Sequence, residues 1–272
     1  MIALAGSGHI GGALGAAEIF AVLYRDILRL DSERAVSIDV NHDRFILSNG
    51  HICAAWYAVL ARTGYLPLAE LATHRRLGSR LQGHPSRAKW PEAVEYSSGP
   101  LGQGLSVANG LAMALRMRGG TGRVFCLVGD GEMEEGQIWE AIHSAGHHNL
   151  GNVVLLVAWN DVQIDGFVHN VKGLDPLKPK LEAFGWRVME VDGHDTESLR
   201  STLTSERGEV TNGYGMPRAI IAKTVLGKGV SFMENRPAWH GSPVTRKQAM
   251  AALAEIGSCD GFDDFPTPGG EL

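Results

Sequence analysis

The chain has 272 residues, of which 44% are hydrophobic and 20% charged, and its formal net charge is −5. This length and composition predict one large globular α/β domain, and an acidic balance without a basic stripe argues against nucleic acid as the main partner. No apolar run approaches the length of a membrane span, and three scattered cysteines without a CxxC pair are typical of a reduced, cytoplasmic protein.

Strands and helices are predicted to alternate along the chain. Apolar residues at helical spacing predict helices over 16–30, 52–62, 68–75, 105–117, 137–149, 179–184, 196–207 and 245–256. Short apolar runs predict strands over 43–47, 123–128, 153–157, 186–191 and 217–224. This alternation favours a single doubly wound, mostly parallel sheet with helices on both faces. Residues 1–257 are expected to form this one domain, and 258–272 a flexible C-terminal tail.

A glycine-rich loop near the N-terminus matches a dinucleotide-binding pattern only by its letters. Gly6, Gly8 and Gly11 give the spacing GxGxxG. In that motif the glycines follow a strand, and an acidic residue about 20 positions later ends a second strand. Here only five residues precede Gly6, and Asp31 follows a helical segment. We therefore do not expect a nicotinamide cofactor, and interpret the glycines as allowing close helix packing and the approach of a ligand.

The most informative motif is Gly129-Asp130-Gly131, with Asn160 placed 30 positions after Asp130. Each of these polar residues follows a predicted strand, so both are expected at the carboxyl ends of neighbouring parallel strands, where open α/β sheets bind ligands. Their oxygens suit a hard cation such as Mg2+, and the glycines let the backbone approach a diphosphate. Taken alone, the motif is better explained as a tight turn after a strand.

Four further blocks support a ligand site. They are Gly8-His9, the SNGH run at 48–51, Gly83-His84 with the GPLGQG run at 99–104, and Trp239-His240-Gly241. Together with GDG and the later Asn, these blocks resemble the thiamine diphosphate signature and, more specifically, the transketolase family. The resemblance extends from Gly6 to about Pro243 but covers only the N-terminal, diphosphate-binding half of a full-length transketolase. Because 227–241 is especially similar to transketolases split into two chains, the chain is identified as the N-terminal subunit of such an enzyme.

The resemblance implies thiamine diphosphate and Mg2+ as cofactors, with Ca2+ or Mn2+ able to replace the metal. Asp130 and Asn160 would hold the metal through side-chain oxygens, and Val162 through its backbone carbonyl. Contacts to thiamine diphosphate are implied for His51, Gly99, Leu101, Gly129, Gly131, Ile164 and His240. Among these, His51 and His240 would donate hydrogen bonds to the diphosphate.

Catalytic roles are implied for His9, His84, His240, Glu135 and Glu140. The first two histidines would face the reacting carbons and handle hydroxyl protons. The two glutamates would join a proton-relay and dimer-contact network between two cofactor sites, although solvated acids at a helix start are the alternative explanation.

Other polar residues near these motifs receive a structural interpretation. Glu132 and Glu134 are expected to be ordinary charges. The histidines expected to be structural are His42, His74, His143, His147 and His148. Two positions depart from the family pattern: Ile10 stands where proline is usual, and Trp159 precedes Asn160 where an acid or asparagine is common.

One functional group is expected to come from elsewhere. In transketolases the glutamate that activates the cofactor belongs to the pyrimidine-binding domain, for which this sequence leaves no room. We therefore expect the chain to be inactive alone and to need a C-terminal transketolase subunit carrying that glutamate, in an α2β2 assembly with sites between chains. We expect sugar-phosphate substrates and no membrane partner.

The predicted activity is transfer of a two-carbon ketol unit from a ketose phosphate to an aldose phosphate. An unusual sugar, sulfonated or branched, is an open alternative. Within the thiamine enzymes, a deoxyxylulose-phosphate-synthase-like or E1α-like subunit is another, although the GPLGQG and SNGH blocks favour transketolase. A non-catalytic regulatory relic is the alternative from a different class, and the presence of Asp130, Asn160, His51 and His240 argues against it.

Overall fold

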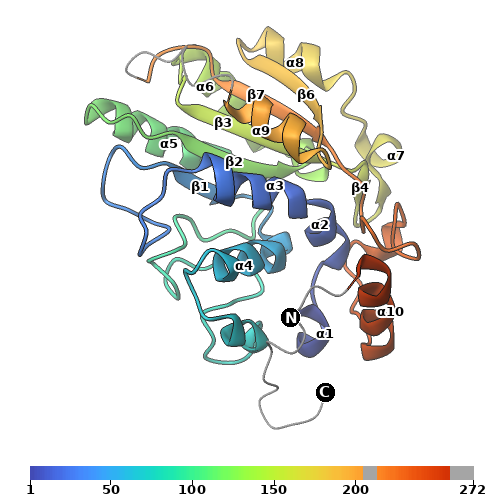
Figure 1. Ribbon diagram of the computed structural model, residues 1–272. Helices are drawn as coiled ribbons and strands as arrows, with labels where there is room; N and C mark the ends of the chain where they lie inside the picture. Colours follow the sequence, from blue (N-terminus) through green and yellow to red (C-terminus); the bar gives the residue numbers. More distant parts are fainter. Residues whose placement is uncertain (205–212, 258–272) are drawn as a thin grey trace.

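A computed structural model describes residues 1–204 and 213–257 of the chain. Its centre is a five-stranded sheet in the order β1-β2-β3-β7-β6, in which every pairing is parallel (Figure 1). The strands are β1 (Arg44–Leu47), β2 (Val124–Gly129), β3 (Val153–Trp159), β6 (Arg187–Asp192) and β7 (Arg218–Lys223). The predicted parallel α/β sheet is confirmed, and each strand agrees with a predicted range to within two residues.

Helices cover both faces of the sheet, as predicted (Figure 1). Alternate residues of β2 point to opposite sides: Phe125 and Leu127 belong to one core cluster, and Cys126 and Val128 to the other. The first cluster is closed by helices α2 (Ile10–Gly15), α3 (Ala17–Val22), α4 (Cys53–Arg62) and α9 (Thr196–Thr204). The second is closed by α5 (Gly104–Met117), α6 (Gly136–His147) and α8 (Leu177–Ala183). Burial on both faces explains why the strands read as continuous apolar runs.

Several short elements complete the fold. They are α1 (Ile2–Ala5), α7 (Val168–Lys172), α10 (Arg246–Ile256), an antiparallel hairpin of β4 (Val162–Gln163) and β5 (Gly166–Phe167), a π-helical turn over Leu23–Ile27, and 3-10 helices over Gly50–Ile52, Leu68–Thr73, Gly131–Glu134 and Pro237–Trp239. Among the described residues, no helix is long and apolar enough to cross a membrane.

The structure corrects some of the predicted helices. The single helix expected over 16–30 is instead α3 followed by the π-helical turn, and a 3-10 helix occupies most of 68–75. The predicted start of α10 is confirmed by a capping box, in which Thr245 accepts a hydrogen bond from the Gln248 backbone. The predicted end of the helix at Arg207, and the tail over 258–272, lie outside the described residues.

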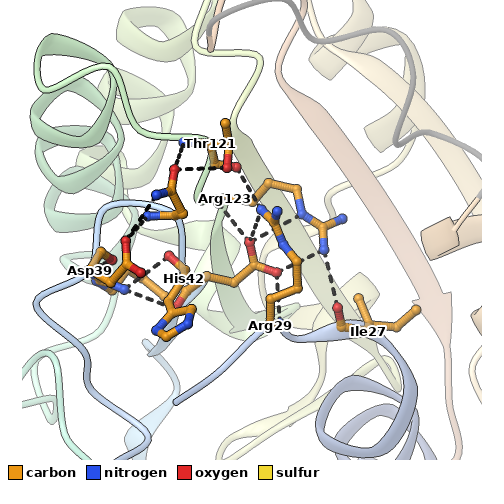
Figure 2. A network of polar contacts seen from close by, with 9 residues as sticks. Ile27, Arg29, Asp39, His42, Thr121 and Arg123 are labelled. Carbon is orange, nitrogen blue, oxygen red and sulfur yellow. Dashed lines mark hydrogen bonds and ion pairs between the residues drawn. The ribbon is translucent and has the colours of Figure 1, made fainter.

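A network of charged side chains ties the amino ends of β1 and β2 together (Figure 2). The Asp43 carboxylate is fully buried. It accepts hydrogen bonds from Arg29 Nη2 at 3.0 Å and from the Arg123 backbone N and Nη2, each at 2.9 Å. Burial alone would raise the pKa of Asp43, but the Arg123 and Arg29 guanidinium groups outweigh it and hold that pKa below its usual value.

Replacing this carboxylate should destabilise the fold. We expect Asp43→Asn to lower the free energy of unfolding by about 3–5 kcal/mol at pH 7, because a buried guanidinium loses its counter-charge. Since the folded pKa is depressed, the contribution of Asp43 is complete above about pH 4 and is lost as pH falls through the folded pKa. Urea unfolding at pH 7, and again at a pH well below about 4, measures the free energy of unfolding of wild type and variant, with Asp26→Asn as the exposed control. A difference below about 1 kcal/mol at pH 7 would show that the network is not stabilising.

Candidate active site

The predicted site residues gather at the carboxyl edge of the sheet. Here β1 leads into Ser48, β2 ends at Gly129, and β3 leads into Asn160. A cavity of about 460 Å3 opens beside these strand ends. Its lining includes eleven of the predicted site residues, namely His9, His51, His84, Gly99, Leu101, Gly129, Gly131, Glu135, Val162, Ile164 and His240. These residues come from segments far apart in the sequence, and the parallel strands are what bring them to one place.

The three predicted metal ligands lie close together, with Val162 in the cavity lining. Asp130 is 2% exposed, and its Oδ2 accepts hydrogen bonds from the backbone N–H groups of Asn160, at 2.8 Å, and Asp161. Asn160 Oδ1 in turn accepts the Val162 N–H at 2.8 Å. Asp161 adopts a positive φ of 59°, which folds the chain sharply between these ligands. The turn therefore brings Asp130, Asn160 and Val162 into one small region.

The electrostatics of Asp130 fit a bound cation. Burial raises the pKa of Asp130 to about 7, although three backbone hydrogen bonds favour its charged form. No ion pair involving Asp130 occurs in the described part of the chain, and the nearby charge that shifts its pKa further is the acidic Asp161. A divalent cation held by two side-chain oxygens and a carbonyl would supply the missing positive charge.

Two glycines let the backbone approach closely at this edge. A Cβ atom at Gly131 would stand 2.8 Å from Cβ of Gln163, and Gly102 combines a φ of +79° with a similar clash against Glu135. The Gly131 N–H, which the sequence predicted as a donor to the diphosphate, here donates to Asp130 Oδ1 at 2.8 Å. Its role toward the cofactor stays a prediction.

Three histidines form a cluster in the cavity wall. The ring centroids of His9 and His51 are 5.0 Å apart, and His240 lies 5.8 Å from the first and 5.3 Å from the second. Burial, followed by the neighbouring histidines, lowers the pKa of His51 to about 3 and that of His9 to about 4. These imidazoles are therefore neutral at pH 7, so each can both donate and accept a hydrogen bond.

Unused polar atoms in this cluster indicate a ligand. Nδ1 of His9 and Nδ1 of His240 are both buried without a hydrogen-bond partner. Buried polar atoms are nearly always satisfied, so such orphans call for an explanation. The His84 ring is more exposed, and a Cβ atom at Gly99 would lie 3.8 Å from it. A polar ligand in the cavity would give these side chains their partners.

The glutamates of this region differ from the sequence interpretation. Glu132 was expected to be an ordinary charge, and this is wrong: its side chain is 2% exposed and accepts hydrogen bonds from three loops. Glu135 is exposed at the cavity wall, whereas Glu140 is exposed on α6 and is not part of the lining. Sequence signals at the start of a helix could not separate these glutamates, because their burial depends on distant loops.

Two of the histidines expected to be structural make contacts that fit this interpretation. His74 is buried, with Nδ1 within 3.2 Å of the Leu81 carbonyl, and His143 packs on Phe184 at a centroid distance of 5.7 Å. Within 1–204 and 213–257, no group of three His, Cys, Asp or Glu side chains could hold a metal ion. The predicted Mg2+ ligand set contains one Asp, one Asn and one backbone carbonyl, so it is not a group of three such side chains.

The Trp159 departure from the family pattern does not disturb the ligand turn. Its ring is 8% exposed and packs in the core cluster shared with α5, α6 and α8. Lys223 Nζ lies 3.9 Å from the ring centroid. The bulky side chain is thus accommodated by the core, and Asn160 keeps its bond to the Val162 N–H.

Comparison with known proteins agrees with this geometry. The family model described as "Transketolase, thiamine diphosphate binding domain" matches residues 1–266. The chain is 37% identical over 251 residues to the 6-deoxy-6-sulfo-D-fructose transketolase subunit SqwG of Clostridium sp. (strain MSTE9), covering 92% of this chain and 89% of that one. It is 38% identical over 249 residues to one of the subunits of the apulose-4-phosphate transketolase of Actinobacillus succinogenes, covering 92% of this chain and 87% of the relative.

Single-chain transketolases match over a smaller share of their length. The Homo sapiens transketolase is 36% identical over 253 residues, which make up 93% of this chain but 39% of that protein. Among solved structures, a transketolase from Leishmania mexicana superposes with a TM-score of 0.85 at 33% identity, covering 93% of this chain and 38% of its own. The chain therefore belongs to the transketolases, a family of thiamine diphosphate-dependent transferases, and matches their thiamine diphosphate-binding domain.

Proposed function

We propose that this chain is the subunit of a two-chain transketolase that binds the diphosphate of thiamine diphosphate and Mg2+. The observation that carries the proposal is the buried Asp130 carboxylate, which has no cationic partner among the described residues and lies at a strand end beside a histidine-lined cavity. Two relatives that are themselves called transketolase subunits match this chain over 87–89% of their length, which supports a two-chain enzyme.

Each group of site residues has a proposed task. Asp130, Asn160 and the Val162 carbonyl hold Mg2+, and His51 and His240 donate hydrogen bonds to the diphosphate. Gly99, Leu101 and Ile164 line the side of the cavity that would face the rings of the cofactor, and Ile164 is 67% exposed there. When bound, thiamine diphosphate supplies the nucleophilic carbon that accepts a two-carbon unit from a ketose and gives it to an aldose.

The histidines would handle the protons of the sugar hydroxyls. Burial lowers the pKa of His9 to about 4, and burial together with Arg75 lowers the pKa of His84. Neutral imidazole accepts a proton from a hydroxyl as a carbonyl forms and returns it in the reverse step. Glu135 and Glu140 are proposed to join a proton relay at the contact between two cofactor sites.

The second chain would supply what this chain lacks. We propose a partner whose pyrimidine-binding domain carries the activating glutamate, in an α2β2 assembly located in the cytoplasm. The names of two relatives suggest further candidate substrates: one is named for a sulfonated fructose and one for apulose 4-phosphate. An unusual sugar is therefore a second candidate substrate beside the common sugar phosphates.

A reconstitution assay tests the two-chain proposal. We expect no two-carbon transfer from the chain alone with Mg2+ and thiamine diphosphate, and transfer once a C-terminal transketolase chain with a pyrimidine-binding domain is added. Donors to compare are xylulose 5-phosphate, 6-deoxy-6-sulfofructose and apulose 4-phosphate, each with several aldose acceptors. Activity from this chain alone would contradict the need for a partner, and inactivity of the mixture with every donor would contradict the proposed reaction.

The role of His240 can be measured separately from chemistry. We expect His240→Ala to weaken thiamine diphosphate binding by the two-chain complex about 10- to 100-fold, because one hydrogen bond to a charged diphosphate is lost. Isothermal titration calorimetry with Mg2+ measures this change. His143→Ala, which removes an exposed histidine from α6, serves as the matched control and should bind normally. Equal affinity in both variants would remove His240 from the diphosphate site.

A further inference from the structure

Glu132 forms the centre of a set of hydrogen bonds that joins three separate loops. Its Oε1 accepts from Ser48 Oγ at 2.5 Å and from the Gly102 N–H at 2.8 Å. Its Oε2 accepts from the Gly129 N–H at 3.2 Å. All three donors are neutral, and the carboxylate is 2% exposed. A buried carboxylate that serves only neutral donors is costly for stability alone, so its presence calls for another benefit.

Each donor lies close in sequence to a residue proposed to contact metal or cofactor. Ser48 is three residues before His51, and Gly102 directly follows Leu101. Gly129 directly precedes Asp130. One side chain therefore fixes the backbone beside three parts of the cofactor site, which come from the ends of β1 and β2 and from the loop before α5.

The packing around Ser48 leaves room for only one residue type at position 104. Ser48 Oγ also accepts the N–H of Gly104, the first residue of α5, at 3.0 Å. A Cβ atom at Gly104 would stand 2.4 Å from Cβ and Oγ of Ser48, so the loop reaches this position only because residue 104 is glycine. The Ser48 hydroxyl thus links Glu132 to the start of α5, because it donates to one and accepts from the other.

We propose that Glu132 is a positioning residue that holds these three loops together, so that the metal turn, the diphosphate contacts and the ring contacts of the cofactor form as one site. This inference rests on the proposed function, because the positions that it aligns are those proposed for thiamine diphosphate and Mg2+. Glu132 holds the loops through both of its carboxylate oxygens, and the role proposed for it is positioning rather than catalysis.

The variant Glu132→Gln isolates the positioning role. The amide keeps the size of the side chain but replaces one acceptor oxygen by an N–H donor. That donor must oppose either the Gly102 N–H or the Gly129 N–H, so one of the two loops is displaced. Glu190→Gln, at an exposed glutamate on β6, removes the same charge away from the site and is the matched control.

Calorimetry on the two-chain complex gives a readout that does not need turnover. We expect Glu132→Gln to raise the Kd for thiamine diphosphate in the presence of Mg2+ by about 10- to 100-fold, as for residues that support metal ligands. Excess cofactor should recover most of kcat, while the KM for cofactor stays high. Glu190→Gln should match wild type in both.

A double-mutant cycle extends the test to Ser48. If Glu132 and Ser48 act through one connection, the double variant Glu132→Gln with Ser48→Ala should lose clearly less affinity than the sum of the single losses. Should Glu132→Gln fail to fold by circular dichroism, Ser48→Ala alone should still weaken cofactor binding.

The outcomes separate this inference from the proposed function. Folded Glu132→Gln that binds thiamine diphosphate as wild type does would overturn the positioning role and leave the proposed function intact. Strictly additive losses in the cycle would also overturn it, as would normal binding by Ser48→Ala. Wild-type complex that does not bind thiamine diphosphate would contradict the proposed function itself.

Discussion

The site depends on one buried carboxylate without a counter-charge. Asp130 is held at the end of β2 by three backbone N–H groups, and burial raises its pKa to about 7. The parallel sheet makes this possible, because it brings the ends of β1, β2 and β3 to one edge. A cation at that edge relieves the cost of burying the charge and, in the same place, presents positive charge to a diphosphate.

The two edges of the sheet differ in whether their buried carboxylates have cationic partners. At the amino edge, Asp43 is paired with arginine side chains, which hold its pKa below the usual value. At the carboxyl edge, Asp130 and Glu132 accept hydrogen bonds only from neutral groups among the described residues, and burial raises the pKa of each to about 7. The first edge is internally compensated and stabilises the fold. The second is left to be completed by a ligand, and proteins commonly concentrate such local cost at functional sites.

The sequence predicted the sheet and most of the residues that line the cavity, but not the hydrogen bonds by which Glu132 joins the loops. Continuous apolar runs such as 153–157 identify strands buried on both faces. Asp130 and Asn160 were predicted as site residues because each follows one of these runs. Glu132 was misjudged because its partners Ser48 and Gly102 are 84 and 30 residues away in the chain. The π-helical turn after α3 was also missed, because apolar residues at helical spacing do not separate an α-helix from a π-helical turn.

The most direct test of the account is the metal dependence of cofactor binding. Thiamine diphosphate is titrated into the two-chain complex, with and without Mg2+, at pH 6 and pH 8, for wild type and Asp130→Asn. Because Asp130 must lose its proton to bind the metal, a pKa of about 7 predicts that wild-type affinity is about ten-fold weaker at pH 6 than at pH 8. Asp130→Asn should lose most of the Mg2+-dependent affinity at both pH values. Binding that is equally tight without Mg2+, or unchanged in Asp130→Asn, would contradict the account.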